Sequence, residues 1–236
     1  MRIALAQTSP APRDLLQRHI EQIALASARG CDLIAFPELS LTGYHPTDVT
    51  RAPSSLEDQQ ITKLEDACKT HDISAVVGAP LRQGAQVLIG ALLISPGEAT
   101  RWYAKRHLHE DEVPFFAEGM REPLFLCQGA RVGLAICYEL FVPQHRELLA
   151  ALSPQLIIAS VAKHTHGLER ARGALAELAR ANKTPTLLVN AAGPCEGFVA
   201  AGGSCWFDAN GERSVCLGQD PDVMIIDLPA NVNAAR

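Results

Sequence analysis

Residues 131–139 read RVGLAICYE, a short apolar run that stops at Cys137 and passes into a polar dipeptide. An apolar run of this length that is bounded by charge favours a buried strand over a helix. Runs of the same kind recur along the chain, at residues 2–7, 32–36, 73–78, 87–95, 155–160 and 186–190. The chain is therefore predicted to build its core around many short, buried strands.

Helical patterns lie between these runs. Residues 14–29 place five large apolar side chains on one side of a helix, and Gly30 stands where that helix would stop. Residues 144–152 and 167–181 have the same periodicity. The alternation of strands and helices predicts an α/β fold.

The last part of the chain changes character. Residues 202–207, 212–217 and 222–228 are predicted strands separated by turn residues, and the pair Asn210-Gly211 is a strong signal for a hairpin. No low-complexity tract, internal repeat or shift of composition marks a linker. We therefore expect a single domain with an antiparallel element near its end.

The composition indicates a folded globular protein, because 47% of the 236 residues are hydrophobic and 20% are charged. The formal net charge is −5 and no basic run is long enough to follow a phosphate backbone, so we expect no nucleic-acid partner. The start of the chain lacks the apolar core of a secretory signal, and no apolar stretch approaches the roughly 20 residues of a membrane span. These observations predict a cytoplasmic protein with no membrane partner.

The chain has seven cysteines, without a CxxC pair or the spacing of a zinc ribbon. Most are expected to be buried, reduced thiols, and taken alone Cys137 has the same explanation. A second buried strand, at residues 32–36, runs directly into Pro37 and Glu38. Taken alone, Glu38 is an ordinary loop glutamate, but ligands gather beyond the carboxyl ends of strands in an open α/β sheet.

Together, Glu38 and Cys137 suggest a chemistry. A free thiol is mostly protonated at neutral pH, and a nearby carboxylate that accepts its proton supplies the nucleophile. Lys105, in the segment WYAKRHL at residues 102–108, also follows a short predicted strand. A lysine there is more often solvated than catalytic. Beside the other two, its ammonium group would stabilise a thiolate and then an oxyanion, and losing one such donor typically costs roughly 3 kcal/mol.

The segments that carry these residues resemble the motifs of the nitrilase superfamily of carbon–nitrogen hydrolases. AFPELSLTGY at residues 35–44 looks like its glutamate motif, YAKRHL at 103–108 like its lysine motif, and GLAICYEL at 133–140 like its cysteine motif. The order of the three residues and the intervals of 67 and 32 residues between them suit the family. Weaker matches extend the resemblance over most of the chain.

The resemblance implies a four-layer αββα sandwich, no cofactor or metal ion, and hydrolysis of an amide through a thioester. Cys137 would attack the amide carbon, and Glu38 would relay the proton to the departing nitrogen. Lys105 and the backbone amide of Tyr138 would hold the oxyanion, and water activated by Glu38 would release the acid. The resemblance also implies a homodimer or a larger homo-oligomer.

Members of the family carry a second glutamate in a loop after the lysine, four residues before a phenylalanine. The stretch FAEG at residues 116–119 fills the matching place, which selects Glu112, with Glu110 as the alternative. Glu118 stands where the family usually has proline.

Two departures from the family pattern bear on the substrate. The family often has an arginine soon after the nucleophile, whereas residues 138–145 read YELFVPQH, which argues against N-carbamoyl amino acids. Tyr138 also replaces the tryptophan that follows the cysteine of true nitrilases. A small-molecule amide is therefore favoured, with a nitrile and a carbamoyl compound as alternatives.

Residues 160–166, SVAKHTH, follow another predicted strand and are expected to form part of the pocket wall. Tyr138, Lys163 and His164 are the candidate substrate-binding residues, and Lys163 would meet an acidic group of the substrate. His164 and His166 have the spacing of a metal pair, but without a third ligand such a pair is more often a polar loop. No metal site is predicted.

Two alternatives outside hydrolysis stay open. A silent binding subunit would keep the sandwich, although the intact set of Glu38, Lys105 and Cys137 argues against silence. An acyltransferase would pass the thioester to an amine or a lipid, and lipid transferases of the family carry membrane spans that this sequence does not show. A cysteine-dependent amidase is the favoured prediction.

Overall fold

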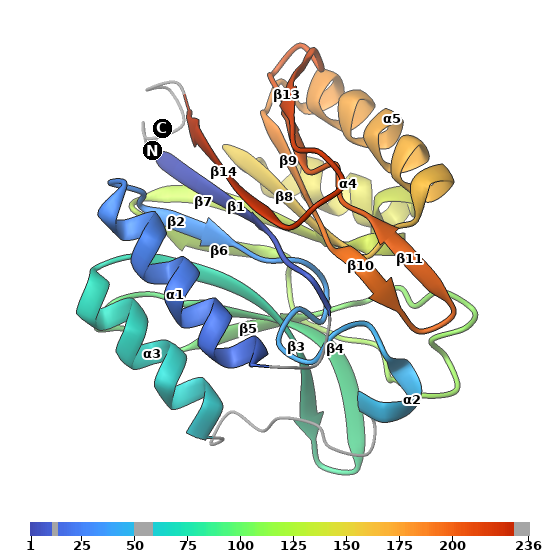
Figure 1. Cartoon of the computed structure of the whole chain (residues 1–236). Coiled ribbons are helices and arrows are strands. Elements are labelled where there is room, and N and C mark those ends of the chain that lie inside the picture. The colour runs from blue at the N-terminus through green and yellow to red at the C-terminus, as the bar shows by residue number, and fades with distance from the viewer. Residues whose placement is uncertain (11–13, 50–58, 229–236) are drawn as a thin grey trace.

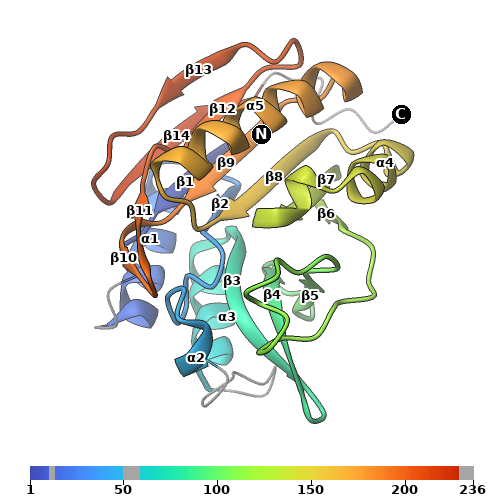
Figure 2. The ribbon, with the colours of Figure 1, turned by 90° about the vertical axis from the view of Figure 1, so that its right-hand side faces the viewer.

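The protein is described by a computed structural model that covers residues 1–10, 14–49 and 59–228. Two six-stranded sheets stack face to face, and helices cover their outer faces (Figure 1). Figure 2 shows the same layers after a quarter turn. The predicted αββα sandwich is confirmed.

The strands of the first sheet are β1 (Arg2–Gln7), β2 (Leu33–Ala35), β3 (Ser74–Gln83), β4 (Gln86–Ile94), β5 (Arg101–Ala104) and β14 (Asp222–Asp227). They lie in the order β14-β1-β2-β3-β4-β5, with a parallel centre and antiparallel edges. Helix α1 (Leu15–Ala28) connects β1 to β2, and helices α2 (Pro46–Val49) and α3 (Gln59–His71) lie between β2 and β3.

The strands of the second sheet are β6 (Leu124–Cys127), β7 (Ala130–Ile136), β8 (Leu156–Val161), β9 (Thr186–Asn190), β12 (Cys205–Phe207) and β13 (Arg213–Cys216). They lie in the order β13-β12-β9-β8-β7-β6. Helices α4 (Pro143–Leu152) and α5 (Thr165–Asn182) join the parallel strands β7, β8 and β9. A separate hairpin consists of β10 (Ala192–Cys195) and β11 (Phe198–Ala201).

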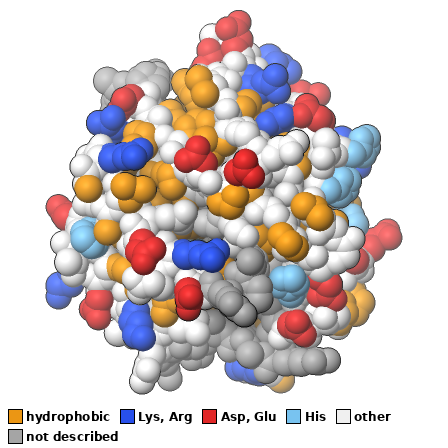
Figure 3. Space-filling model, viewed as in Figure 1, with side chains coloured by type: hydrophobic (Ala, Val, Ile, Leu, Met, Phe, Trp, Pro, Cys, Tyr) orange, Lys and Arg blue, Asp and Glu red, His pale blue; other side chains and the backbone are white. Residues whose placement is uncertain are grey.

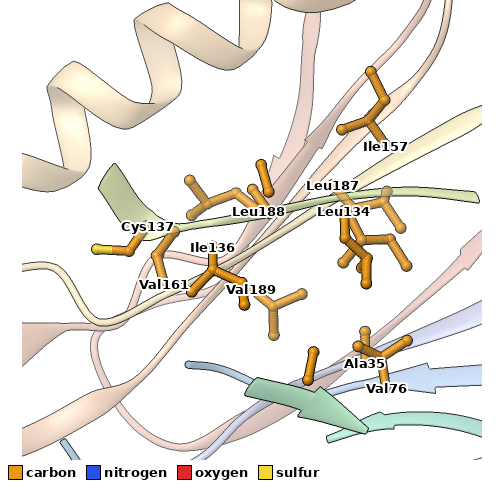
Figure 4. Packing of buried hydrophobic residues seen from close by; sticks show 14 of the residues in the cluster. Ala35, Val76, Leu134, Ile136, Cys137, Ile157, Val161, Leu187, Leu188 and Val189 are labelled. Carbon is orange, nitrogen blue, oxygen red and sulfur yellow. The ribbon is translucent and has the colours of Figure 1, made fainter. Parts of the chain in front are cut away.

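The core between the sheets is apolar and tightly closed to solvent. In Figure 4, Leu134 and Val189 of the second sheet lie on the side that faces Ala35 and Val76 of the first. All four side chains have an exposed fraction of at most 1%. Burying one Val or Leu side chain stabilises the folded state by roughly 1.5–3 kcal/mol. Because many such side chains pack between the sheets, the stacked sheets form a stable base for the loops at their ends.

Most elements agree with the sequence predictions. The Asn210-Gly211 hairpin is confirmed between β12 and β13, where Gly211 has a φ of +73°. The predicted strand at residues 202–207 begins only at Cys205, because Gly202 and Gly203 have φ values of +62° and +70° and turn the chain. Helix α3 and strands β6, β10 and β11 were not predicted.

The strand ends of the two sheets meet where the candidate site lies. Ser160, near the end of β8, donates a hydrogen bond of 2.9 Å to the carbonyl oxygen of Phe36, which follows β2. Glu38 comes two residues later, and Cys137 directly follows the neighbouring strand β7. The stacking therefore brings together residues that the sequence keeps about a hundred positions apart.

On the face shown in Figure 3, Lys and Arg side chains are interspersed with Asp and Glu and gather into no continuous basic stripe. Within the described ranges, no helix has both the length and the hydropathy that crossing a bilayer requires.

Candidate active site

Cys137 occupies a sharp turn at the end of β7. Its φ is +51°, in the left-handed region, which costs a non-glycine residue about 1–2 kcal/mol. The chain then enters a short 3-10 helix, η1 (Cys137–Phe141). The turn places the thiol, which is 7% exposed, at the wall of a pocket.

Glu139 holds this turn against the first sheet. Its buried carboxylate accepts hydrogen bonds from the backbone amides of Ile136 and Arg106, each 2.7 Å long, and from the hydroxyl of Tyr103, 2.6 Å long. The first donor precedes Cys137, and the other two flank the segment that carries Lys105. Glu139 therefore sets the position of the cysteine relative to the lysine. The sequence interpretation gave it no role, although a buried strand that ends in a polar dipeptide was a usable signal.

Lys105 bridges two buried carboxylates. Its Nζ lies 2.8 Å from Oε1 of Glu38 and 2.6 Å from Oε1 of Glu112, and all three side chains are at most 2% exposed. Ion pairs this deeply buried are stable only when their geometry is good and further hydrogen bonds satisfy the groups. The structure thus brings Glu38, Lys105 and Glu112 into direct contact.

One carboxylate oxygen of Glu38 has no hydrogen-bond partner among the described residues. Oε2 of Glu38 is buried and accepts no hydrogen bond from any described residue, so it is available to accept a proton.

Gly78 of β3 packs against the loop that carries Glu38 so closely that a Cβ there would lie 2.1 Å from the carbonyl oxygen of Pro37. The close approach explains why glycine stands at this point of a buried strand.

The structure distinguishes the two candidates for the second glutamate. Oε1 of Glu112 also accepts a hydrogen bond of 3.0 Å from the hydroxyl of Tyr44, and its Oε2 accepts one of 2.8 Å from the backbone amide of His109. Glu110, the alternative, is exposed to solvent. Glu112 therefore lies beside Lys105, as the resemblance implied, and Tyr44 is a neighbour that the sequence interpretation did not single out.

Burial is the largest influence on the pKa values at this site. Burial and then the charge of Glu38 raise the pKa of Cys137, Lys163 and Lys105 lower it, and the net result is a pKa of about 11. Burial also raises the pKa of Glu38, and Lys105 opposes this shift. Burial disfavours the charge on Lys105, but Glu38, Cys137 and Glu112 outweigh it and raise its pKa. The resting site thus pairs a neutral thiol with an unusually basic carboxylate.

The pocket beside Cys137 has a volume of about 360 Å³, which suits a small organic molecule. Its wall includes Tyr44, Phe115, Lys163, His164 and Phe198. Two of the three residues expected to bind substrate, Lys163 and His164, therefore lie at the pocket.

The third, Tyr138, is placed differently, because its ring packs edge-on against His109 at a centroid distance of 5.2 Å. Its side chain does not line this pocket, and a role in binding would have to come from its backbone. His164 and His166 stack at 6.5 Å between ring centroids, and Nδ1 of His164 accepts a hydrogen bond from the backbone amide of Gly167. No cluster of three or more potential metal ligands occurs in the described part of the chain.

The fold and this constellation agree with one family. The sequence profile of the carbon–nitrogen hydrolases matches residues 2–236, and the chain belongs to that family. Its structural neighbours are amidases of the nitrilase superfamily.

Particular relatives make the likeness more specific. An (R)-stereoselective amidase from a Pseudomonas species is 29% identical, over 100% of this chain and 88% of its own length. An amidase from Nesterenkonia sp. AN1, in a form with acrylamide added at its active-site cysteine, superposes with a TM-score of 0.88 and 28% identity, covering 98% of this chain and 94% of that one. The glutamine-dependent NAD(+) synthetase of Xylella fastidiosa is 30% identical over 89% of this chain, which spans only 41% of that protein.

Proposed function

We propose that this carbon–nitrogen hydrolase is a cysteine-dependent amidase that cleaves a small-molecule amide to a carboxylic acid and ammonia or an amine. The observation that carries the proposal is the contact of Lys105 with Glu38 and Glu112, the last of which lines the same pocket as Cys137. The proposal extends to a single domain over residues 1–236, to a cytoplasmic location and to a homodimer or larger homo-oligomer, as the family resemblance implies.

The first half of the reaction forms a thioester. Glu38 takes the thiol proton of Cys137 on its free Oε2, and the sulfur attacks the carbonyl carbon of the amide. Lys105 and the backbone amide of Tyr138 donate hydrogen bonds to the oxyanion of the tetrahedral intermediate. Glu38 then returns the proton to the nitrogen, the carbon–nitrogen bond breaks, and the amine leaves.

The second half releases the acid. Glu38 takes a proton from water, the resulting nucleophile attacks the thioester carbon, and the proton returns to the sulfur as the carbon–sulfur bond breaks. Glu112 acts by holding Lys105, because its Oε1 lies 2.6 Å from the lysine Nζ. Fixed donors of this kind stabilise an oxyanion without reorganising during the reaction.

Two observations favour an amide as the substrate. The Pseudomonas and Nesterenkonia relatives, which match 100% and 98% of the chain, are amidases, and the pocket volume of about 360 Å³ suits a small molecule. We further propose that His164 and the backbone of Tyr138 contact the substrate. Nitrile hydrolysis and removal of a carbamoyl group are the alternative reactions for the same residues.

The test is a panel of small amides, nitriles and carbamoyl compounds, with ammonia release measured alongside the intact mass of the protein. We expect ammonia from an amide and a mass increase equal to the acyl group, both lost in Cys137→Ala. The matched controls are Cys31→Ala and Cys68→Ala, which remove buried thiols outside the pocket. Equal activity in Cys137→Ala and the parent would contradict the mechanism, and turnover of nitriles alone would contradict the substrate class.

A further inference from the structure

A second lysine, Lys163, lies at the nucleophile. It follows β8 by two residues, and its backbone is held on both sides: its amide donates a hydrogen bond of 2.8 Å to Oδ1 of Asn190, and its carbonyl accepts bonds from Nδ2 of Asn190 (3.0 Å) and the amide of Ala201 (2.9 Å). With its backbone anchored in this way, the side chain lines the same pocket as Cys137.

The ammonium group of Lys163 is directed to the cysteine turn. Its Nζ lies 5.3 Å from the ring centroid of Phe141, the last residue of η1, and Lys163 lines the same pocket as Cys137, the first residue of η1. In the described part of the chain, Lys163 forms no ion pair with a carboxylate. Among the described residues, no carboxylate therefore lies within ion-pair distance of its ammonium group, in contrast to that of Lys105.

A charge count shows what the second lysine adds. The ionised carboxylates of Glu38 and Glu112 and the ammonium of Lys105 sum to −1, and Lys163, which is partly buried, brings the sum to zero. When the proton moves from Cys137 to Glu38, the negative charge moves from the carboxylate to the sulfur. Lys105 stays held by Glu112 at 2.6 Å, so the ammonium that meets the new charge at the sulfur is Lys163.

We propose that Lys163 is a further catalytic residue, which stabilises the thiolate of Cys137 during thioester formation. The inference rests on the proposed function and deepens it. Lys163 neither gives nor takes a proton: the thiol proton goes to Glu38, the sulfur electron pair forms the bond to the carbonyl carbon, and Lys163 stays an ammonium ion. It acts on the sulfur, whereas Lys105 acts on the oxyanion.

The electrostatics of the site support this division. Lys163 lowers the pKa of Cys137, after burial and Glu38 have raised it, and its effect is larger than that of Lys105. Burial lowers the pKa of Lys163, but Cys137 and then Glu38 raise it by more, so that the pKa lies above its usual value. The titratable groups that act on the thiol from the elements around it are Glu38, Lys105, Glu112, Lys163 and Tyr44.

The test measures the reactivity of the thiol without any substrate. Iodoacetamide is reacted with the protein across pH 6 to roughly 10, where free thiols titrate, and alkylation of Cys137 is followed by peptide mass spectrometry. The variants are Lys163→Met, which removes the charge, Lys163→Gln, which keeps a hydrogen-bond donor, and Lys163→Arg, which keeps the charge. The matched control is Arg170→Met, because Arg170 lies 5.2 Å from the same Phe141 ring and lines the same pocket, but is not among the groups named above that act on the thiol.

We expect alkylation of Cys137 at pH 7 to be about tenfold slower in Lys163→Met and Lys163→Gln, which corresponds to a rise of about one pKa unit. The deficit should persist at every pH up to 10, because burial and Glu38 raise the pKa of Cys137 to about 11 and its thiol stays mostly protonated over this range in every variant. Lys163→Arg should keep most of the parent rate, and Arg170→Met should keep all of it.

Two results would overturn the inference. One is a folded neutral variant whose rates of Cys137 alkylation equal those of the parent at every pH. If the KM for acidic amides rose in that variant while alkylation was unchanged, Lys163 would bind substrate and would not stabilise the thiolate. The other is equal slowing in Arg170→Met, which would show a general effect of pocket charge. Because alkylation requires no turnover, the expected profile in a protein that hydrolyses no amide would contradict the proposed function alone.

Discussion

Glu139 offers a sharp test of how the site is assembled, because one buried carboxylate joins the cysteine turn to the lysine strand. In Glu139→Gln, one of the two oxygens becomes an NH2 group. In the parent, Oε1 accepts hydrogen bonds from the Tyr103 hydroxyl and the Arg106 amide, and Oε2 accepts one from the Ile136 amide. The NH2 group of the glutamine cannot accept a hydrogen bond, so at least one of these three donors loses its acceptor. Losing one hydrogen bond to a charged acceptor costs about 1.5–3 kcal/mol. In Glu139→Ala all three buried donors lose their acceptor, at about 1–3 kcal/mol each.

These costs are set against a total stability of about 5–15 kcal/mol for a typical domain. We expect Glu139→Gln to fold with a Tm lower by roughly 3–10 °C, at about 2–4 °C per kcal/mol for a chain of this size. Its alkylation rate at Cys137 and its kcat should fall together, because the turn loses its anchor. Glu139→Ala should be at the limit of folding.

Thermal melting and site-resolved alkylation measure both effects, with Glu147→Gln on α4 as the control, since that glutamate is exposed. A Tm and an alkylation rate in Glu139→Gln equal to those of Glu147→Gln would refute the assignment of Glu139 as the residue that positions the turn.

Three further predictions concern the neighbours of the site. Burial raises the pKa of Glu38, so the folded state binds its proton more tightly than the unfolded chain does. The contribution of Glu38 to stability is therefore full at low pH and is lost as the pH rises through its raised pKa. Glu38→Gln, which lacks the base, should be inactive, yet its Tm should exceed that of the parent by more at pH 7 than at pH 4; an equal difference at both would contradict this. Gly78→Ala places its Cβ 2.1 Å from the carbonyl oxygen of Pro37 and should lower both Tm and kcat. By contrast, Gly173 in α5 has open space around it, so Gly173→Ala should raise the free energy of unfolding, measured in urea, by about 0.5–1 kcal/mol. Tyr44→Phe removes the 3.0 Å hydrogen bond to Glu112 and should lower kcat several-fold in steady-state kinetics with little change in Tm. An unchanged kcat would show that Lys105 and the backbone amide of His109 suffice to hold Glu112.

Local patterns were sufficient for most of the framework. The buried strands and helices α1, α4 and α5 were predictable because apolar periodicity and turn residues are properties of neighbouring positions. Helix α3 carried the same signal, with Ile61, Leu64 and Cys68 buried on one face, and could have been predicted. The hairpin of β10 and β11 gave a weaker signal, because Ala192–Cys195 contains glycine and proline, and Phe198–Ala201, although apolar, is only four residues long.

The sequence by itself determined that Glu38, Lys105 and Cys137 each stand just beyond a strand, because the end of an apolar run is visible from adjacent residues. It did not determine their contacts. Only the stacking of the two sheets brings the end of β2 to the end of β7, and only there do burial and charge raise the pKa of Cys137 to about 11. The contact of Lys105 with Glu112, which the sequence had selected ahead of Glu110, was likewise decided by the tertiary structure. So were the anchoring role of Glu139 and the approach of Lys163 to the thiol, because hydrogen bonds and Coulomb forces act between groups that are close in space, whatever their separation along the chain.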